Sequence, residues 1–171
     1  MQKKTPLKKA FLRKYPESVV LVTSVDRDGR ANVMAVGWIA MASLEPPMFV
    51  LGIDDEAHTY RLIRRTRQFV VAFPSTRMIR ETLFVGSCHG QGRDKFTECG
   101  LAMQKALQVR APLVADAVAN FECTLEKIYQ PGDCPLVVGR IVAAHENINC
   151  KVTRLCSIGP RHRLGAVSIQ R

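Results

Sequence analysis

A glycine-rich segment in the middle of the chain carries the side chains best suited to holding an anion. Residues 86–96 run Gly-Ser-Cys-His-Gly-Gln-Gly-Arg-Asp-Lys-Phe. Glycine-rich loops expose backbone N–H groups, and such a loop leading into a helix can bind phosphate. Arg93 and Lys95 add positive charge, and Ser87 adds a hydroxyl. The segment matches neither a P-loop nor a dinucleotide fingerprint, so a plain surface loop is the competing interpretation.

A second candidate is the apolar segment 32–38, Asn-Val-Met-Ala-Val-Gly-Trp. Side chains alternate along a strand, which places the small Ala35 and Gly37 on one face and Trp38 on the other. Small residues let a flat ligand approach the backbone, whose N–H and C=O groups can pair with the edge of a ring. The competing interpretation is an ordinary core strand.

Two further clusters raise the question of metal or nucleophile chemistry. Three acids at 54–56 precede His58 and Thr59, but acids before a helix more often cap it than bind metal. His58 and Thr59 are instead candidates to hydrogen-bond a ligand over the helix start. Cys88 and His89 are adjacent, which rarely gives a nucleophile–base pair. No Ser/His/Asp arrangement and no paired carboxylates stand out, so redox chemistry would need a bound cofactor.

Strand and turn signals dominate the elements that must position these residues. Apolar and β-branched runs predict strands at 18–24, 32–41, 48–53, 69–73, 120–129, 136–144 and 151–156. Short helices are predicted at 58–67, from Ser75 or Thr76 to Phe84, and from an Asp94 cap to Gly100. Turns join most strands, as at Asp26–Gly29. The pattern therefore predicts a mainly β chain with short helices, an antiparallel barrel rather than a doubly wound sheet.

Length, charge and cysteine content narrow the class of protein. The 171 residues fit one domain, and the net charge of +10 suits an anionic partner. Six scattered cysteines without a C-x-x-C pair predict a reducing compartment. The basic start lacks a following apolar run, and the uncharged stretch 31–44 is shorter than the roughly 20 residues a bilayer needs. We expect a soluble, cytoplasmic protein.

In their order along the chain, these motifs resemble the flavin reductase-like, FMN-binding split-barrel family, and its flavoredoxin branch most closely. The resemblance covers residues 10–146, within a single domain 1–171 whose tail, 147–171, does not align. The residues that carry it are Tyr15-Pro16, Val19–Ser24, Asp26, Gly29, Asn32–Ala35, Gly37-Trp38, Ser43, Pro46-Pro47, Thr59-Tyr60, Ile63, Phe69–Val71, Gly86, Gly90, Asp94–Phe96, Gly100-Leu101, Ala111–Leu113, Glu122-Cys123 and Gly132-Asp133.

The resemblance implies a homodimer of split barrels with FMN near the subunit interface and NADH or NADPH as a possible electron donor. By carry-over, the 32–38 strand lies against the flavin ring, Ser43 and Thr59 contact the flavin or its ribityl chain, and the 87–90 loop and Lys95 hold the phosphate. The implied cofactor-binding residues are Asn32, Met34, Ala35, Val36, Gly37, Trp38, Ser43, His58, Thr59, Ser87, Cys88, His89, Gly90 and Lys95. His89 stands where the family often has Ser, and Gln91-Gly92 stand where it often has Arg-Asp.

Three functions are compatible with these observations. The first is an NAD(P)H:flavin oxidoreductase, in which the flavin carries the chemistry and no side chain is itself catalytic. The second is an FMN-bound electron carrier that reacts poorly with NAD(P)H, and the sequence cannot separate it from the first. The third, a nucleic-acid-binding barrel, is suggested by the charge but disfavoured by an aromatic content of only 6%.

Overall fold

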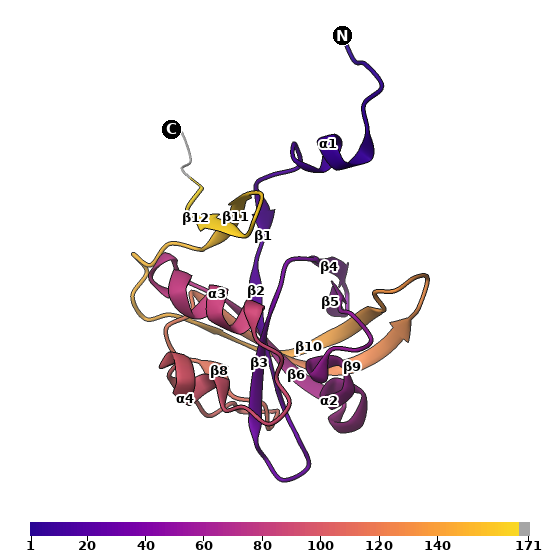
Figure 1. Cartoon of the computed structure of the whole chain (residues 1–171). Helices are drawn as coiled ribbons and strands as arrows, with labels where there is room; N and C mark the ends of the chain where they lie inside the picture. The colour runs from indigo at the N-terminus through magenta and orange to yellow at the C-terminus, as the bar shows by residue number, and fades with distance from the viewer. Residues whose placement is uncertain (168–171) are drawn as a thin grey trace.

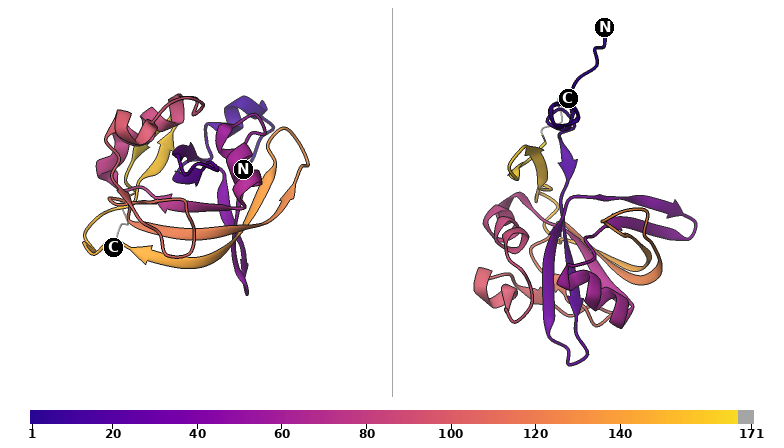
Figure 2. Two further views of the ribbon diagram at one scale, coloured as in Figure 1. Left: turned by 90° about the horizontal axis from the view of Figure 1, so that it is seen from below. Right: turned by 45° about the vertical axis from the view of Figure 1, so that its right-hand side comes forward.

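A strongly curved, seven-stranded antiparallel sheet is the centre of the computed structural model, which describes residues 1–167 (Figures 1 and 2). Its strands lie in the order β3-β2-β6-β9-β10-β5-β4. Their bounds are β2 Val20–Val25, β3 Ala31–Val36, β4 Ile39–Leu44, β5 Pro47–Gly52, β6 Gln68–Phe73, β9 Ala119–Tyr129 and β10 Leu136–Glu146. Because β3 and β4 are consecutive in sequence yet form opposite edges, the sheet curls into a barrel split between them. The predicted antiparallel split barrel is confirmed.

The predicted hairpin turn between the first two long strands is confirmed in its geometry. The Asp26 side chain accepts the Arg30 N–H at 2.8 Å, and Gly29 has φ +86°. Only glycine adopts that backbone conformation without steric cost. The turn fixes the register of β2 and β3, which pairs Ser24 with Asn32 and Val20 with Val36.

The predicted single strand 32–41 is wrong, because two strands replace it. β2 offers no partner beyond the pair of Val20 with Val36, so the chain turns at Gly37-Trp38 and pairs β4 with β5 instead. The Gly52 N–H donates to the Trp38 carbonyl at 2.9 Å. A Cβ at Gly52 would lie 3.1 Å from the Trp38 ring, so the indole packs closely against residue 52 because that residue has no side chain.

The two largest of three apolar clusters among the described residues lie on the two faces of the sheet. One fills the barrel and includes Val36 with Met34 packed against it, and the other contains Val33 with Ala35 packed against it. The predicted alternation of this strand is therefore confirmed. The second core is closed by α3, Ile79–Ser87, and α4, Lys95–Cys99, which cover the outer face of the sheet in Figure 1.

The helices follow the predicted caps, with differences at their ends. Helix α2 spans His58–Thr66 and ends at Arg67, whose φ of 61° is left-handed. Helix α3 follows a 3-10 turn, η1, at Thr76–Met78 and runs three residues beyond the predicted end. Helix α4 is capped by the Asp94 side chain, which accepts the Thr97 N–H at 3.1 Å. Within residues 1–167 no helix combines the length and the apolar character that crossing a bilayer requires.

The tail differs from the prediction. Residues 151–155 form only an isolated antiparallel bridge, Arg154 with Ser75, in place of the predicted strand. Its hydrogen bonds run from Leu155 N–H to Pro74 O and from Thr76 N–H to Thr153 O, each at 2.8 Å. A hairpin follows and pairs with the amino-terminal end of the chain. The remaining elements are α1 Leu7–Phe11, β1 Glu17–Ser18, β7 Met103–Gln104, β8 Leu113–Val114, β11 Cys156–Gly159 and β12 Arg163–Gly165. Residues 168–171 of the predicted tail lie outside the described residues.

Gly139, in β10, is expected to tolerate no side chain. A Cβ there would collide with the ring of Phe69, which is fully buried inside the barrel. We expect Gly139→Ala to lower the free energy of unfolding by about 1–3 kcal/mol, the usual cost of overpacking a core. Urea denaturation measures it. Gly132→Ala is the control, because a Cβ at Gly132 meets open space. Equal stability of the two variants would contradict the packing argument.

Candidate functional site

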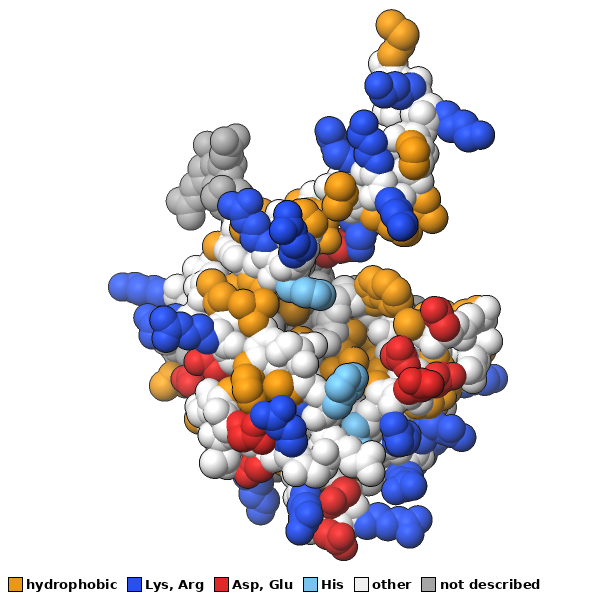
Figure 3. Space-filling view, in the orientation of Figure 1, with side chains coloured by type: hydrophobic (Ala, Val, Ile, Leu, Met, Phe, Trp, Pro, Cys, Tyr) orange, Lys and Arg blue, Asp and Glu red, His pale blue; other side chains and the backbone are white. Residues whose placement is uncertain are grey.

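A cleft of about 850 Å³ lies where the free edge of β3 meets the start of α2 and the end of α3. Figure 3 shows this front face hollowed between the helices and β4. Ten of the fourteen sequence-predicted residues line the cleft: Asn32, Met34, Ala35, His58, Thr59, Ser87, Cys88, His89, Gly90 and Lys95. These residues come from three segments that the fold brings together.

Four predicted residues do not line this cleft. The Val36 side chain is 3% exposed and packs inside the barrel, and Gly37 lies at the break between strands. Trp38 and Ser43 belong to the β4 side of the split, where Trp38 is 59% exposed and lies against Gly52. The split between β3 and β4 separates these two from the cleft proper, because the single strand predicted there is broken.

Lys95 is a buried cation at the floor of the cleft. Its side chain is 3% exposed, and its Nζ donates to the carbonyl of Val33 at 3.1 Å and to that of Val85 at 3.3 Å. Burial lowers the pKa of Lys95 below its usual value. Within residues 1–167 it forms no ion pair. An ammonium has three donors, so one donor and the whole charge are left without a protein partner.

Asn32 presents an unused acceptor in the same cleft. Its Nδ2 donates to Thr59 Oγ1 at 2.8 Å, which fixes the orientation of the amide, while its Oδ1 is buried and finds no partner among residues 1–167. A buried acceptor left unpaired costs about 1–3 kcal/mol. Gly90 approaches so closely that a Cβ there would collide with Asn32 Oδ1. The arrangement is suited to a ligand that donates a hydrogen bond to Asn32.

The glycine-rich loop differs from the expected phosphate cradle in two respects. Gly86 and Ser87 belong to the last turn of α3, so the loop begins only at Cys88. The first turn of α4 is already occupied, because Asp94 caps it with its own carboxylate. Its start is therefore not an open anion site, and Lys95 is the group of this segment that offers positive charge to the cleft. Arg93 is instead paired with Glu98.

The start of α2 is the second positive feature of the cleft. Ala57, at the N-cap position, makes no side-chain hydrogen bond, so the first N–H groups of α2 have no side-chain cap. Burial first, then the charges of Arg61 and Lys95, lower the pKa of His58 below its usual value, which favours a neutral imidazole. The acids at 54–56 were expected to start this helix, but they lie in the preceding turn and line the cleft. The sequence analysis missed Arg61, which also lines the cleft. Its position one helical turn after His58 could have predicted that both side chains lie on the same face of α2.

Cys88 lies beside Ser87, with Sγ and Oγ 3.9 Å apart, and both line the cleft. Its neighbour His89 is exposed, and no hydrogen bond between the two side chains occurs within the described residues. The part of the chain that the structure describes contains no cluster of three or more His, Cys, Asp or Glu side chains suited to a metal ion.

Comparisons with known proteins also point to a flavin-related family. A family model described as a flavin reductase like domain matches residues 12–155. An uncharacterized protein of Pyrococcus abyssi is 33% identical over 129 residues, which are 75% of this chain and 73% of that protein. A flavin reductase of Pseudomonas putida is 29% identical over 136 residues, which are 78% of this chain and 75% of that enzyme.

Among solved structures, the flavoredoxin of Desulfovibrio vulgaris (Miyazaki F) superposes with a TM-score of 0.88. It is 25% identical, and the match covers 99% of this chain and 96% of that one.

Proposed function

The chain belongs to the flavin reductase-like family, and on that premise we propose that it binds FMN in the cleft and passes electrons from NADH or NADPH to flavin or to a downstream acceptor. Bound FMN would supply the electron-accepting ring. The side chains of the cleft would bind and orient the cofactor. The likeness to a flavin reductase and to a flavoredoxin supports flavin chemistry and leaves the electron donor to experiment.

The observation that carries the proposal is the buried, unpaired charge of Lys95 beside the unpaired acceptor of Asn32. A ribityl phosphate carries nearly two negative charges at neutral pH and accepts charge-assisted hydrogen bonds. Lys95 and the uncapped start of α2 would hold it. Asn32 would accept a hydrogen bond from the cofactor, and Thr59 would keep the Asn32 amide in the required orientation.

The free edge of β3 is suited to the ring. Because β3 is an edge strand, half of its backbone N–H and C=O groups have no strand partner. Ala35 keeps that edge accessible, and Met34 adds apolar surface. A ring lying along this edge would extend across the split toward Gly37, Trp38 and Ser43, so we keep these residues and Val36 as proposed contacts. Donors at this edge would stabilise negative charge on the reduced ring.

An anaerobic visible spectrum tests the proposal. We expect the purified protein, or the protein after addition of FMN, to show a flavin spectrum that bleaches with NADH or NADPH. A flavin spectrum that neither nucleotide bleaches would identify the second candidate, a flavoredoxin-like carrier that waits for a redox partner. A protein that stays colourless with added FMN would contradict both.

Gly90→Ala is expected to weaken FMN binding without unfolding the protein. The added Cβ would displace Asn32 Oδ1 and press on the His58 ring, 3.3 Å away. We expect the dissociation constant for FMN to rise about tenfold or more, which corresponds to the roughly 1–3 kcal/mol of an overpacked site. Quenching of FMN fluorescence measures it, with Gly132→Ala as the control. Unchanged affinity would show that the cofactor does not use Asn32.

The β4 surface supports the proposal of a homodimer. All six residues of β4 are apolar or hydroxyl-bearing, and the strand forms an edge of the sheet. Leu44 is 81% exposed, and Trp38 and Met41 are exposed as well. A long, uncharged edge strand left in water is prone to uncontrolled pairing, and a second copy would cover it.

The free cysteines support the proposal of a cytoplasmic protein, and the shared sheet supports a single domain. All six are free thiols, although several are accessible enough to oxidise. A reducing compartment keeps such thiols unpaired. The two cores share the same sheet, so we propose that the chain folds as one domain.

A further inference from the structure

Three carboxylates line the cleft, and no ion pair with any of residues 1–167 balances them. They belong to Asp54, Asp55 and Glu56, which form the rim before α2. The proposed cofactor is an anion, which these carboxylates would repel at close range. Arg61, which lines the same cleft, donates to the backbone carbonyl of Glu56 and forms no ion pair with these carboxylates, so the rim can accept further positive charge.

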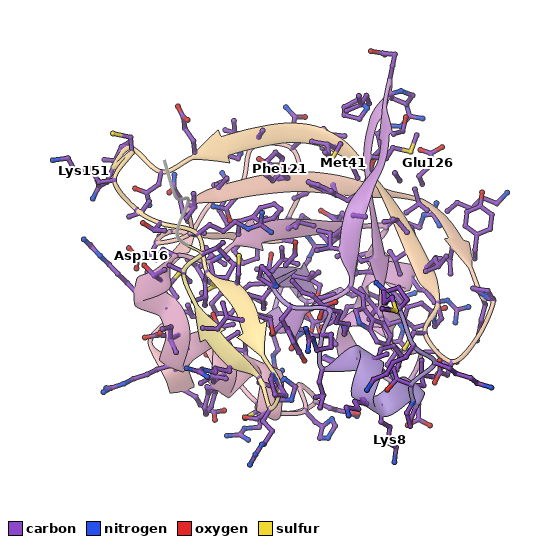
Figure 4. All side chains as sticks on the ribbon, turned by 90° about the horizontal axis from the view of Figure 1, so that it is seen from above. Lys8, Met41, Asp116, Phe121, Glu126 and Lys151 are labelled. Carbon is purple, nitrogen blue, oxygen red and sulfur yellow. The ribbon has the colours of Figure 1, made fainter. Side chains whose placement is uncertain are left out.

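The amino-terminal arm, residues 1–14, supplies the opposite charge, and apart from the pair of Lys14 with Glu17 its side chains make no hydrogen bond or ion pair with the described residues beyond it. It contains six Lys or Arg and no acid, and its helix α1 has no buried residue. Figures 1 and 2 show it standing clear of the body, and Lys8 in Figure 4 points into open space. Leu7 and Phe11 on the same arm are 67% and 52% exposed. An apolar, basic segment of this kind requires a partner surface that is apolar and acidic.

That surface exists on the same chain. The exposed face of β4 runs from Leu44 back toward Trp38, which lies against Gly52, two residues before Asp54. An apolar strip thus leads to the acidic rim. Figure 3 shows hydrophobic side chains in the hollow below the arm and acidic side chains on the right of the body. The arm does not reach this strip in its own copy, so a second copy is the fitting partner.

We propose that the amino-terminal arm of a second copy docks along β4 and brings its lysines to Asp54, Asp55 and Glu56, so that each copy completes the cleft of the other. This inference rests on the proposed homodimer and adds which segment of one copy covers the cleft of the other. Neutralised carboxylates no longer repel an anionic cofactor, so FMN binds more tightly to the dimer than to the monomer. Because these charges are exposed, salt weakens the dimer.

A charge-swap cycle on the full chain tests the docking. One variant carries Lys8→Glu and Lys9→Glu, a second carries Asp54→Lys and Asp55→Lys, and a third combines both. Sedimentation equilibrium gives the dimer dissociation constant of each. We expect each reversal to raise it about tenfold or more, from two lost ion pairs plus repulsion, and the combination to recover most of that loss.

The matched control is Lys105→Glu with Lys151→Glu, two exposed lysines outside the arm, the first in the loop after β7. Lys151 lies far from Met41 of β4 in Figure 4. This control changes the net charge as much as the arm variant does and should leave the dimer intact. Thermal melts confirm that every variant folds.

The outcomes separate this inference from the proposed function. A monomeric parent protein, or two reversals whose effects add without rescue, overturns the docking while FMN binding stands. Charge-swap rescue in a dimer that binds no FMN overturns the proposed function while the docking stands. An arm reversal that leaves the dimer unchanged but abolishes binding to anionic vesicles overturns the docking in favour of a membrane surface.

Discussion

Replacing Lys95 with methionine is expected to weaken FMN binding about 10- to 100-fold, or roughly 1–3 kcal/mol, because the variant loses the charge-assisted contact to the phosphate. Methionine keeps most of the buried volume. The free protein should lose little stability, because an unpaired buried charge is itself a cost to folding. FMN fluorescence quenching gives the affinity, and a thermal melt without FMN gives the stability.

Lys105→Met is the control for Lys95→Met, because Lys105 is exposed and lies outside the cleft. Wild-type FMN affinity in Lys95→Met would place the phosphate elsewhere, with the start of α2 as the remaining positive group. A large loss of stability without FMN would instead indicate that Lys95 serves mainly to join β3 to α3 through its two carbonyl acceptors.

The pH dependence gives the same substitution a second readout. Burial lowers the pKa of Lys95 below the 10.5 of a free lysine. FMN affinity should fall as pH rises through that lowered pKa, because the ammonium loses its charge. The free protein should gain stability in the same window, because the unfolded chain there holds a proton that the folded chain has lost. Lys95→Met should abolish both dependences.

The second large effect is on stability: Glu122→Ala is expected to lower the free energy of unfolding by about 3–5 kcal/mol. Glu122 is fully buried, and its carboxylate accepts hydrogen bonds from four donors. Its Oε1 accepts the Leu107 N–H at 2.8 Å and His145 Nε2 at 2.6 Å. Its Oε2 accepts the N–H groups of Gln108 and Val109 at 2.6 and 2.9 Å. Alanine leaves all four donors without an acceptor and frees the 107–109 loop.

Glu126→Ala is the matched control, from the same strand. Glu126 is exposed and paired with Arg140 at 3.0 Å, and an exposed pair of this kind contributes at most about 1 kcal/mol. Urea denaturation of both variants measures the difference. Equal losses would mean that the 107–109 loop does not depend on the buried carboxylate.

Acid should reproduce the Glu122 effect in the parent protein. Burial by itself would raise the pKa of Glu122, but the donors from Leu107, His145, Gln108 and Val109 outweigh it and hold that pKa below its usual value. The stabilisation is therefore complete above the pKa of the unfolded chain and is lost as pH falls through the lowered one. Denaturation midpoints at falling pH should show a larger loss in the parent than in Glu122→Ala, which keeps only other carboxylates with lowered pKa, such as Asp94 and Glu98.

The sequence by itself determined the turns, helix caps and strand alternation that depend on residues only a few positions apart. The Asp26–Gly29 turn, the Asp94 cap and the alternation of Ala35 with Met34 each depend on neighbours along the chain. The order of many short motifs along the chain also identified the family, because those motifs occur in the same order in the flavin reductase-like family. In the same way the sequence supplied ten residues that line one cleft.

Only the tertiary structure decided where the predicted strand 32–41 divides into β3 and β4, and which charged side chains are buried. Periodicity did not predict the break at Gly37-Trp38, because it depends on where β2 ends and on the indole lying against Gly52. The sequence predicted the strand that contains Glu122 but not the 107–109 loop that covers its carboxylate. Lys95 looked like a loop cation, yet it reaches Val33, 62 positions away. A sequence pattern indicates which face a side chain takes, but only the folded chain supplies what lies opposite, and that neighbour sets the energy of a charge.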